Sequence, residues 1–155
     1  MSTVTINKPV PAFTAHSTQG DISHESLRGH YTVLFFYPRN NTPGCTTESQ
    51  DFRDHHDAFK AANCRVIGVS RDTLTSHGKV TEKLDLPYPL IADPDETFCE
   101  LFGVMKLKNM YGKQVRGIER STFLINPDGI LITEWRKVRV PGHVADVLQT
   151  VQEHT

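Results

Sequence analysis

The chain has 155 residues, of which 37% are hydrophobic and 23% are charged, and its formal net charge is −1. A chain of this length can bury a core as one domain, residues 1–155, without disulfides or a structural metal. The balanced charge argues against disorder and against a strong field toward nucleic acid or membranes, so we expect a small or weakly charged partner.

The first part of the chain predicts a parallel strand–helix–strand unit. Residues 1–31 carry little pattern beyond a small hairpin expected near residues 12–21. Residues 32–37 form an apolar, β-branched and aromatic run that is typical of a strand buried on both faces. A helix is expected from Thr42 to about Ala62, and residues 64–70 form a second buried run. A right-handed crossover through that helix makes the two strands parallel.

The second part predicts alternating helices and strands that end in a hairpin and a helix. The expected elements are a helix over 73–84, a strand over 88–92, a short helix over 96–102, strands over 121–125 and 130–135, and a last helix over 142–152. The two later strands flank Asn126-Pro127-Asp128-Gly129, a typical turn sequence. This is the element order of the thioredoxin-like fold, an α/β fold whose central mixed sheet is flanked by helices on both faces. The N-terminal hairpin extends it.

Cys45 is the residue whose setting predicts chemistry. Thr42 and Pro43 are a typical helix start, because a threonine oxygen can accept from free amides and proline lacks an N–H at the first helical position. Cys45 then lies in the first turn, where unpaired amides and the helix dipole favour the thiolate, the form that attacks. Gly44 leaves the amides uncovered, which suits an oxygen-rich substrate. The alternative is that Cys45 is a small buried core residue.

The motifs around this cysteine carry a family resemblance. Pro38-x-x-x-Thr42-x-x-Cys45 matches the active-site pattern of the peroxiredoxins. Residues 37–48 with 52–54 resemble the peroxiredoxin Q, or bacterioferritin comigratory protein, subfamily, and residues 68–72, 108–113 and 117–123 follow in the order that this subfamily shows. The resemblance spans nearly the whole chain. It implies an AhpC/TSA-like, thiol-dependent peroxidase without a cofactor.

The resemblance also implies a role for each residue around the thiol. Cys45 would attack one oxygen of a hydroperoxide and become a sulfenic acid. Thr42 would offer its hydroxyl to the peroxide, and Arg120 would stabilise the thiolate and the charge that develops on the leaving oxygen. Pro38 would shield the pocket from water. The main-chain N–H groups of Gly44 and Cys45 are candidate peroxide contacts.

Two charged residues near the thiol have simpler alternatives. Glu48 follows Cys45 by one helical turn, and a carboxylate there opposes thiolate formation unless it orients a cation. The family pattern suggests that Glu48 orients an arginine, whereas the alternative is an ordinary acidic residue of the first turn. Arg120 could instead form a surface ion pair with Glu119 or place a charge at the sheet edge.

The chain departs from the subfamily at the second cysteine. Many members resolve the sulfenic acid with a cysteine five residues after the first or on the next helix, where this chain has Gln50 and Thr81. Cys64 begins the second core strand, at the other end of the sheet, and is expected to be a core residue. Cys99 returns toward the end that carries Cys45, so it is a candidate resolving thiol as well as a packing residue. We expect a one-cysteine cycle in which thioredoxin, glutaredoxin or glutathione reduces the sulfenic acid.

Cysteine usage and the N-terminal sequence bear on location. Three cysteines without a C-x-x-C pair fit a reducing compartment, and the first twenty residues lack the apolar run of a secretory signal. No stretch is apolar over the length of a bilayer span. We therefore expect a soluble cytoplasmic protein, and a monomer because the sequence has no evident exposed apolar helix stripe.

Other site classes are less well supported. His55 and His56 lack metal-ligand spacing and are expected to be solvated, so no metal site is predicted. Gly112-Lys113 is expected in a loop without a preceding strand, unlike a phosphate-binding loop. The walls of a substrate pocket are expected to come from residues near Tyr37, Met110 and Tyr111.

Two other functional classes stand beside the peroxidase. One is a non-enzymatic thioredoxin-like redox sensor or binding module, in which oxidation of Cys45 changes a partner contact. The other is a disulfide oxidoreductase, which is disfavoured because thioredoxin-type chemistry uses C-x-x-C and position 48 is Glu.

Overall fold

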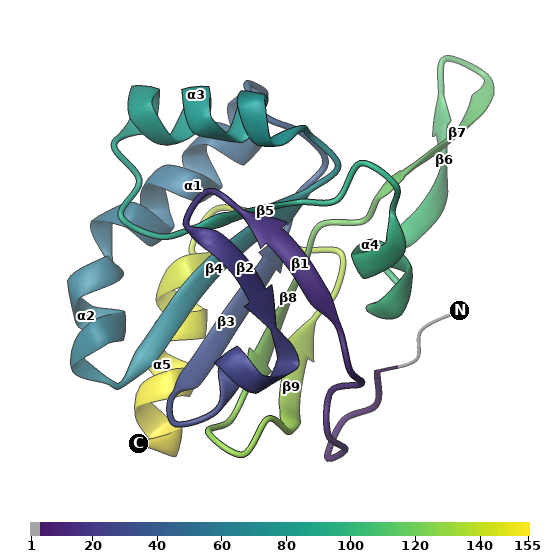
Figure 1. Cartoon of the computed structure of the whole chain (residues 1–155). Helices are drawn as coiled ribbons and strands as arrows, with labels where there is room; N and C mark the ends of the chain where they lie inside the picture. Colours follow the sequence, from purple (N-terminus) through teal and green to yellow (C-terminus); the bar gives the residue numbers. More distant parts are fainter. Residues whose placement is uncertain (1–3) are drawn as a thin grey trace.

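A seven-stranded mixed sheet forms the centre of the molecule (Figure 1). The computed structural model describes residues 4–155. Three central strands run parallel, namely β3 (Tyr31–Phe36), β4 (Cys64–Ser70) and β5 (Leu90–Ala92). The other strands of this sheet are antiparallel to their neighbours: β1 (Thr14–Ser17), β2 (Gly20–Ser23), β8 (Ser121–Ile125) and β9 (Leu131–Trp135). The strand order is β2-β1-β5-β4-β3-β8-β9.

Helices cover both faces of this sheet, as the sequence predicts. One face packs against α1 (Pro43–Asp54), α2 (His56–Ala61), α3 (Leu74–Leu84) and α5 (His143–His154). The other face packs against α4 (Thr97–Leu101) and the short 3-10 helix η1 (His24–Leu27), and the edge strands β1 and β2 add Ala15 and Ile22 to the same cluster. Along β3, Val33 and Phe35 join the first cluster, whereas Leu34 and Phe36 join the second. This alternation explains why the sequence of β3 is apolar throughout.

The predicted helix over 42–62 is divided in two at His55. The backbone of His55 has φ −100° and ψ 4°, so α1 ends before it and α2 begins after it. Its ring nitrogen Nδ1 lies 2.8 Å from the carbonyl oxygen of Asp51, within the last turn of α1. Both His55 and His56 are half-buried, and burial lowers the pKa of His56. The expectation that they are simply solvated is therefore wrong.

The sequence also misses a second, two-stranded sheet. β6 (Met105–Met110) and β7 (Lys113–Ile118) form an antiparallel hairpin that projects from the rest of the molecule (Figure 1). Its turn residues, Tyr111 and Gly112, both have positive φ, the combination that suits a two-residue hairpin turn. The prediction that Gly112-Lys113 follows no strand is wrong. The strands were hidden because β7 is exposed along most of its length and shows no alternation of apolar and polar residues.

Gly68 of β4 gives a prediction about core packing. A Cβ atom on Gly68 would lie 2.7 Å from Leu90 Cδ2 and 2.8 Å from Phe35 Cζ. We expect Gly68→Ala to lower the free energy of unfolding by about 1–3 kcal/mol, because both neighbours would have to move within a packed core. Gly78 of α3 has open space at its Cβ position, so Gly78→Ala is the control and should stabilise by about 0.5–1 kcal/mol. Urea unfolding measures both, and a Gly68→Ala protein as stable as the parent would contradict the packing described.

Candidate active site

The C-terminal end of β3 brings distant segments of the chain together. Phe36, the last residue of β3, pairs with Val69 of β4 on one side and with Ser121 of β8 on the other. The chain leaves β3 and enters α1 at Pro43, while Arg120 immediately precedes β8. The first turn of α1 and the Arg120 side chain therefore meet at one edge of the sheet.

A buried hydrogen-bond network fixes the loop between β3 and α1. The Tyr37 hydroxyl donates to Asn40 Oδ1 at 2.8 Å, and Asn40 Nδ2 lies 3.0 Å from His77 Nδ1. The backbone N–H of Asn40 also donates to Asp72 Oδ2 at 2.9 Å. Burial raises the pKa of Tyr37 well above its ordinary value. Tyr37 is thus a core residue that positions the loop.

One guanidinium connects the thiol of Cys45 to the carboxyl group of Glu48. Arg120 Nη2 donates to Cys45 Sγ at 3.4 Å, and Arg120 Nη1 donates to Glu48 Oε1 at 2.7 Å. Cys45 is 2% exposed and Glu48 is fully buried. Both lie on the buried face of α1, one turn apart, so a single forked side chain can reach the two at once. The structure therefore pairs Arg120 with the buried Glu48, and not with Glu119 at the surface.

Burial dominates the electrostatics of this triad. It raises the pKa of Glu48 to about 7, because the charged form loses its hydration, and the neighbouring Arg120 offsets only part of this effect. Within residues 4–155, Oε2 of Glu48 has no hydrogen-bond partner. Burial alone would lower the pKa of Arg120, but the nearby Glu48 and Cys45 raise it above its ordinary value. Arg120 therefore stays charged beside the sulfur.

Thr42, Gly44 and Pro38 surround the start of α1. Thr42 occupies the residue before the helix, but its hydroxyl donates to the Arg39 carbonyl oxygen at 3.0 Å instead of capping the first-turn amides. The prediction of a threonine cap is wrong in this respect. A Cβ atom on Gly44 would lie 3.3 Å from Arg120 Nη2, so the absence of a side chain there gives the guanidinium room. Pro38 is half-buried and helps to line a cavity of about 340 Å³ at this edge of the sheet.

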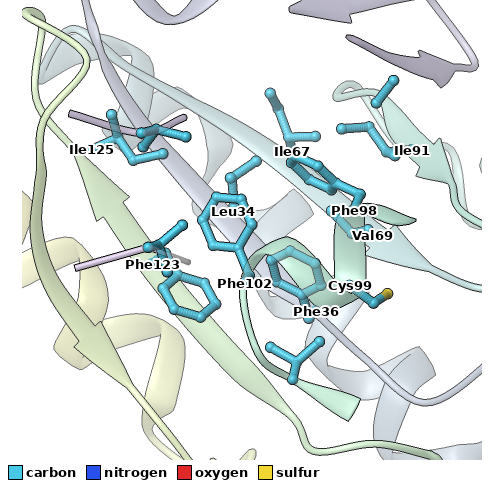
Figure 2. Packing of buried hydrophobic residues seen from close by; sticks show 14 of the residues in the cluster. Leu34, Phe36, Ile67, Val69, Ile91, Phe98, Cys99, Phe102, Phe123 and Ile125 are labelled. Carbon is cyan, nitrogen blue, oxygen red and sulfur yellow. The ribbon is translucent and has the colours of Figure 1, made fainter. Parts of the chain in front are cut away.

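The other two cysteines lie away from this site. Cys64 pairs with Tyr31 at the start of β3, the opposite end of the strand from α1, and burial raises the pKa of its thiol to about 12. Cys99 is fully buried in the cluster on the α4 face, among Phe36, Phe98 and Phe102 (Figure 2). Cys45 belongs to the cluster on the other face of the sheet. In this conformation the sheet separates Cys99 from Cys45, and burial raises the pKa of the Cys99 thiol.

Lys108 is a site residue that the motif search did not single out. It lies on β6, close enough to Arg120 and Cys45 for their charges to affect it, and burial with the nearby Arg120 lowers its pKa. The sequence does contain a hint, because Lys108 is the first residue of the family-like segment 108–113. The pattern of apolar and polar residues, however, gives Lys108 no role. Tyr111 is fully exposed at the hairpin tip, and Met110 is not among the residues whose side chains the structure describes.

No metal-binding group was found among residues 4–155: the described His, Cys, Asp and Glu side chains do not gather in threes or more around a common point. The same residues contain no helix long and apolar enough to cross a membrane.

Comparisons with known proteins agree with this geometry. Residues 6–133 match the AhpC/TSA family. Peroxiredoxin Bcp of Bacillus subtilis is 46% identical over 152 residues, which cover 97% of each chain. A structure of Xanthomonas campestris peroxiredoxin Q is 44% identical with a TM-score of 0.87, over 92% of this chain and 90% of that one. A mutant of Xylella fastidiosa peroxiredoxin Q is 36% identical with a TM-score of 0.92, over 99% of both chains.

The chain belongs to the AhpC/TSA family of thioredoxin-like proteins. Its relatives in that family are peroxiredoxins of the Bcp and peroxiredoxin Q type, which confirms the resemblance found in the sequence.

The raised pKa of Glu48 predicts a pH-dependent stability. The folded state holds the Glu48 proton more tightly than the unfolded state, so this contribution is complete below about pH 4.5 and is lost as pH rises through about 7. The full loss is about 3 kcal/mol. Glu48→Gln cannot titrate, so its stability relative to the parent should rise by most of this amount between pH 5 and pH 8. Urea unfolding of both proteins measures this, and parallel pH profiles would contradict the raised pKa.

Proposed function

We propose that residues 1–155 act as one thiol peroxidase domain that reduces hydrogen peroxide and organic hydroperoxides through a Cys45 sulfenic acid. The observation that carries this proposal is the buried contact of Arg120 with both Cys45 Sγ and Glu48. A related Xanthomonas campestris bacterioferritin comigratory protein, 43% identical with a TM-score of 0.87, was solved in trapped states that concern alkyl peroxide reduction.

The first half-reaction follows from the positions of these groups. The Cys45 thiolate attacks one oxygen of the hydroperoxide, an S–O bond forms, and the O–O bond breaks. The leaving alkoxide or hydroxide takes a proton from water. Arg120 stabilises the thiolate before attack and the charge on the leaving oxygen during it. The first-turn amides of Gly44 and Cys45 have no intrahelical acceptors and are available to the peroxide oxygens.

The other site residues have supporting roles in this proposal. Glu48 orients the guanidinium of Arg120, because the contact of Nη1 with Glu48, together with that of Nη2 with Cys45 Sγ, limits its rotation. Thr42 offers its hydroxyl to the peroxide after exchanging its bond to Arg39. Pro38 limits the access of water to Cys45.

The second half-reaction uses an external thiol. Gln50 and Thr81 stand where related proteins carry a resolving cysteine, and Cys99 is buried on the other face of the sheet. A donor thiolate attacks Cys45 Sγ, hydroxide leaves as water, and a second donor thiol then releases reduced Cys45 with formation of a donor disulfide. Thioredoxin, glutaredoxin and glutathione are the candidate donors. We further propose a cytoplasmic monomer.

Intact-mass analysis after one equivalent of hydrogen peroxide separates the two possible cycles. We expect the protein to gain one oxygen atom, as a Cys45 sulfenic acid, and Cys99→Ser to behave in the same way. A Cys45–Cys99 disulfide would instead remove two hydrogen atoms and would disappear in Cys99→Ser. That outcome would contradict the one-cysteine cycle while leaving the peroxidase assignment intact.

Turnover separates the peroxidase from a redox sensor. We expect repeated consumption of hydrogen peroxide with at least one thiol donor, and its loss in Cys45→Ser but not in Cys64→Ser. A single stoichiometric oxidation with every donor in the panel would favour the non-enzymatic sensor.

Gly44→Ala tests the placement of Arg120. The added methyl group would lie 3.3 Å from Arg120 Nη2, so the guanidinium must shift by a few tenths of an ångström. We expect the second-order rate constant for Cys45 oxidation to fall about tenfold, because catalysis is sensitive to small displacements of a charged group. Competition kinetics against a reference peroxidase measures the rate constant, with Gly78→Ala as the control. An unchanged rate constant would show that this position of Arg120 is not required.

A further inference from the structure

The β6–β7 hairpin is set apart from the sheet that carries the active site. It forms a two-stranded sheet of its own, and Figure 1 shows it extending beyond the helices and the main sheet. Its base is buried, where Met105 is 9% exposed and Ile118 is fully buried. Lys106, Leu107, Tyr111, Lys113 and Val115 are exposed to solvent.

The charge of the hairpin differs from that of the whole protein. Residues 105–118 contain four Lys or Arg residues and no Asp or Glu, whereas the chain as a whole has a formal net charge of −1. Arg116 is paired with Glu96 and Glu100 of the α4 region. The three lysines are not ion-paired to any carboxylate of residues 4–155.

The strand register gathers these lysines on one face. Lys106 pairs with Gly117, Lys108 with Val115, and Met110 with Lys113. Because side chains alternate between the faces of a strand, the hairpin basic face consists of Lys106, Lys108, Lys113 and Val115. Leu107 and Arg116 lie on the opposite face.

Apolar surface is also exposed on this hairpin. Of the five exposed large hydrophobic side chains among the described residues, three belong to it: Leu107, Tyr111 and Val115. Val115 is 43% exposed on the basic face itself, and Tyr111 is completely exposed at the tip. A surface that combines exposed apolar groups with one sign of charge is suited to a protein partner of the opposite charge.

The hairpin basic face leads directly to the reactive sulfur. Lys108 Nζ donates to the carbonyl oxygen of Ile118, two residues before Arg120. From Ile118 at the end of β7 the chain passes through Glu119 to Arg120, which contacts Cys45 Sγ. A molecule seated on this face would therefore contact the end of the hairpin from which the chain reaches Arg120, the residue in contact with Cys45.

We propose that the hairpin basic face docks the protein dithiol that reduces the Cys45 sulfenic acid, and that this partner presents an acidic surface beside its reactive cysteine. The inference rests on the proposed function. A second copy of this chain is disfavoured as the occupant, because two such faces would bring like charges together. Docking places the donor thiolate next to Cys45 Sγ, where the S–S bond forms as the S–O bond breaks and the hydroxide leaves as water.

A double charge reversal, Lys106→Glu with Lys113→Glu, tests the proposal. The probes are thioredoxin and glutaredoxin, and the readout is the second-order rate constant for reduction of peroxide-oxidised Cys45. We expect a fall of about tenfold or more at low salt, which shrinks near 1 M salt, where the Debye length is about 3 Å. Reduction by dithiothreitol and oxidation by hydrogen peroxide should be unchanged. The control, Lys79→Glu with Lys83→Glu, makes the same charge change on exposed positions of α3 and should match the parent.

Several outcomes would overturn the docking surface. One is that both protein donors reduce the double variant as fast as the parent. Another is an equal loss of rate in the α3 control, or with dithiothreitol as the donor. A last one is that neither protein donor reduces the parent faster than dithiothreitol does. Sedimentation that shows a dimer of the parent and a monomer of the double variant would assign the face to a second copy instead. If Cys45 of the parent does not react with hydrogen peroxide, the proposed function itself fails, and this result is distinct from all the others.

Discussion

The forked contact of Arg120 is the interaction on which the rest of the site depends. Its guanidinium holds the Cys45 sulfur with one nitrogen and the Glu48 carboxyl group with the other, in a region nearly closed to solvent. Charge interactions are stronger there than in water, so the position of this one cation has a large effect on the groups that it contacts. The sheet determines that position. Because β8 pairs with β3, Arg120, which immediately precedes β8, lies next to α1, the helix that follows β3.

Burying Glu48 has a cost that a surface residue would avoid. The carboxyl group is fully buried, one of its oxygens is unpartnered within residues 4–155, and its pKa is raised to about 7. Such groups are often retained because they fix geometry and not because they add stability. Here the geometry in question is the orientation of the Arg120 guanidinium. Without a partner, this long and flexible side chain would not hold one orientation. The role that we propose for Glu48 is therefore to act on Cys45 through Arg120.

Much of the fold could be predicted from the sequence, for identifiable reasons. β3 and β4 are apolar on both faces, so their runs are unambiguous, and the first turn of α1 is marked by Pro43. The β6–β7 hairpin was missed because β7 is exposed along most of its length and carries no alternation of apolar and polar residues. Around the site, sequence reasoning found Cys45, Arg120 and Glu48 through family motifs, but the roles of Asn40 and His77 depend on contacts between residues more than 30 positions apart. No local pattern encodes such contacts.

A double-mutant cycle on the rate of Cys45 oxidation by hydrogen peroxide tests the central claim most directly. The cycle compares the parent with Arg120→Gln, Glu48→Gln and the double variant. We expect a loss of about 10²–10³-fold for Arg120→Gln and a smaller loss for Glu48→Gln. Because Glu48 acts only by holding the guanidinium, the double variant should be no slower than Arg120→Gln alone. Losses that multiply in the double variant would show that Glu48 and Arg120 act independently, and would contradict this description of the site.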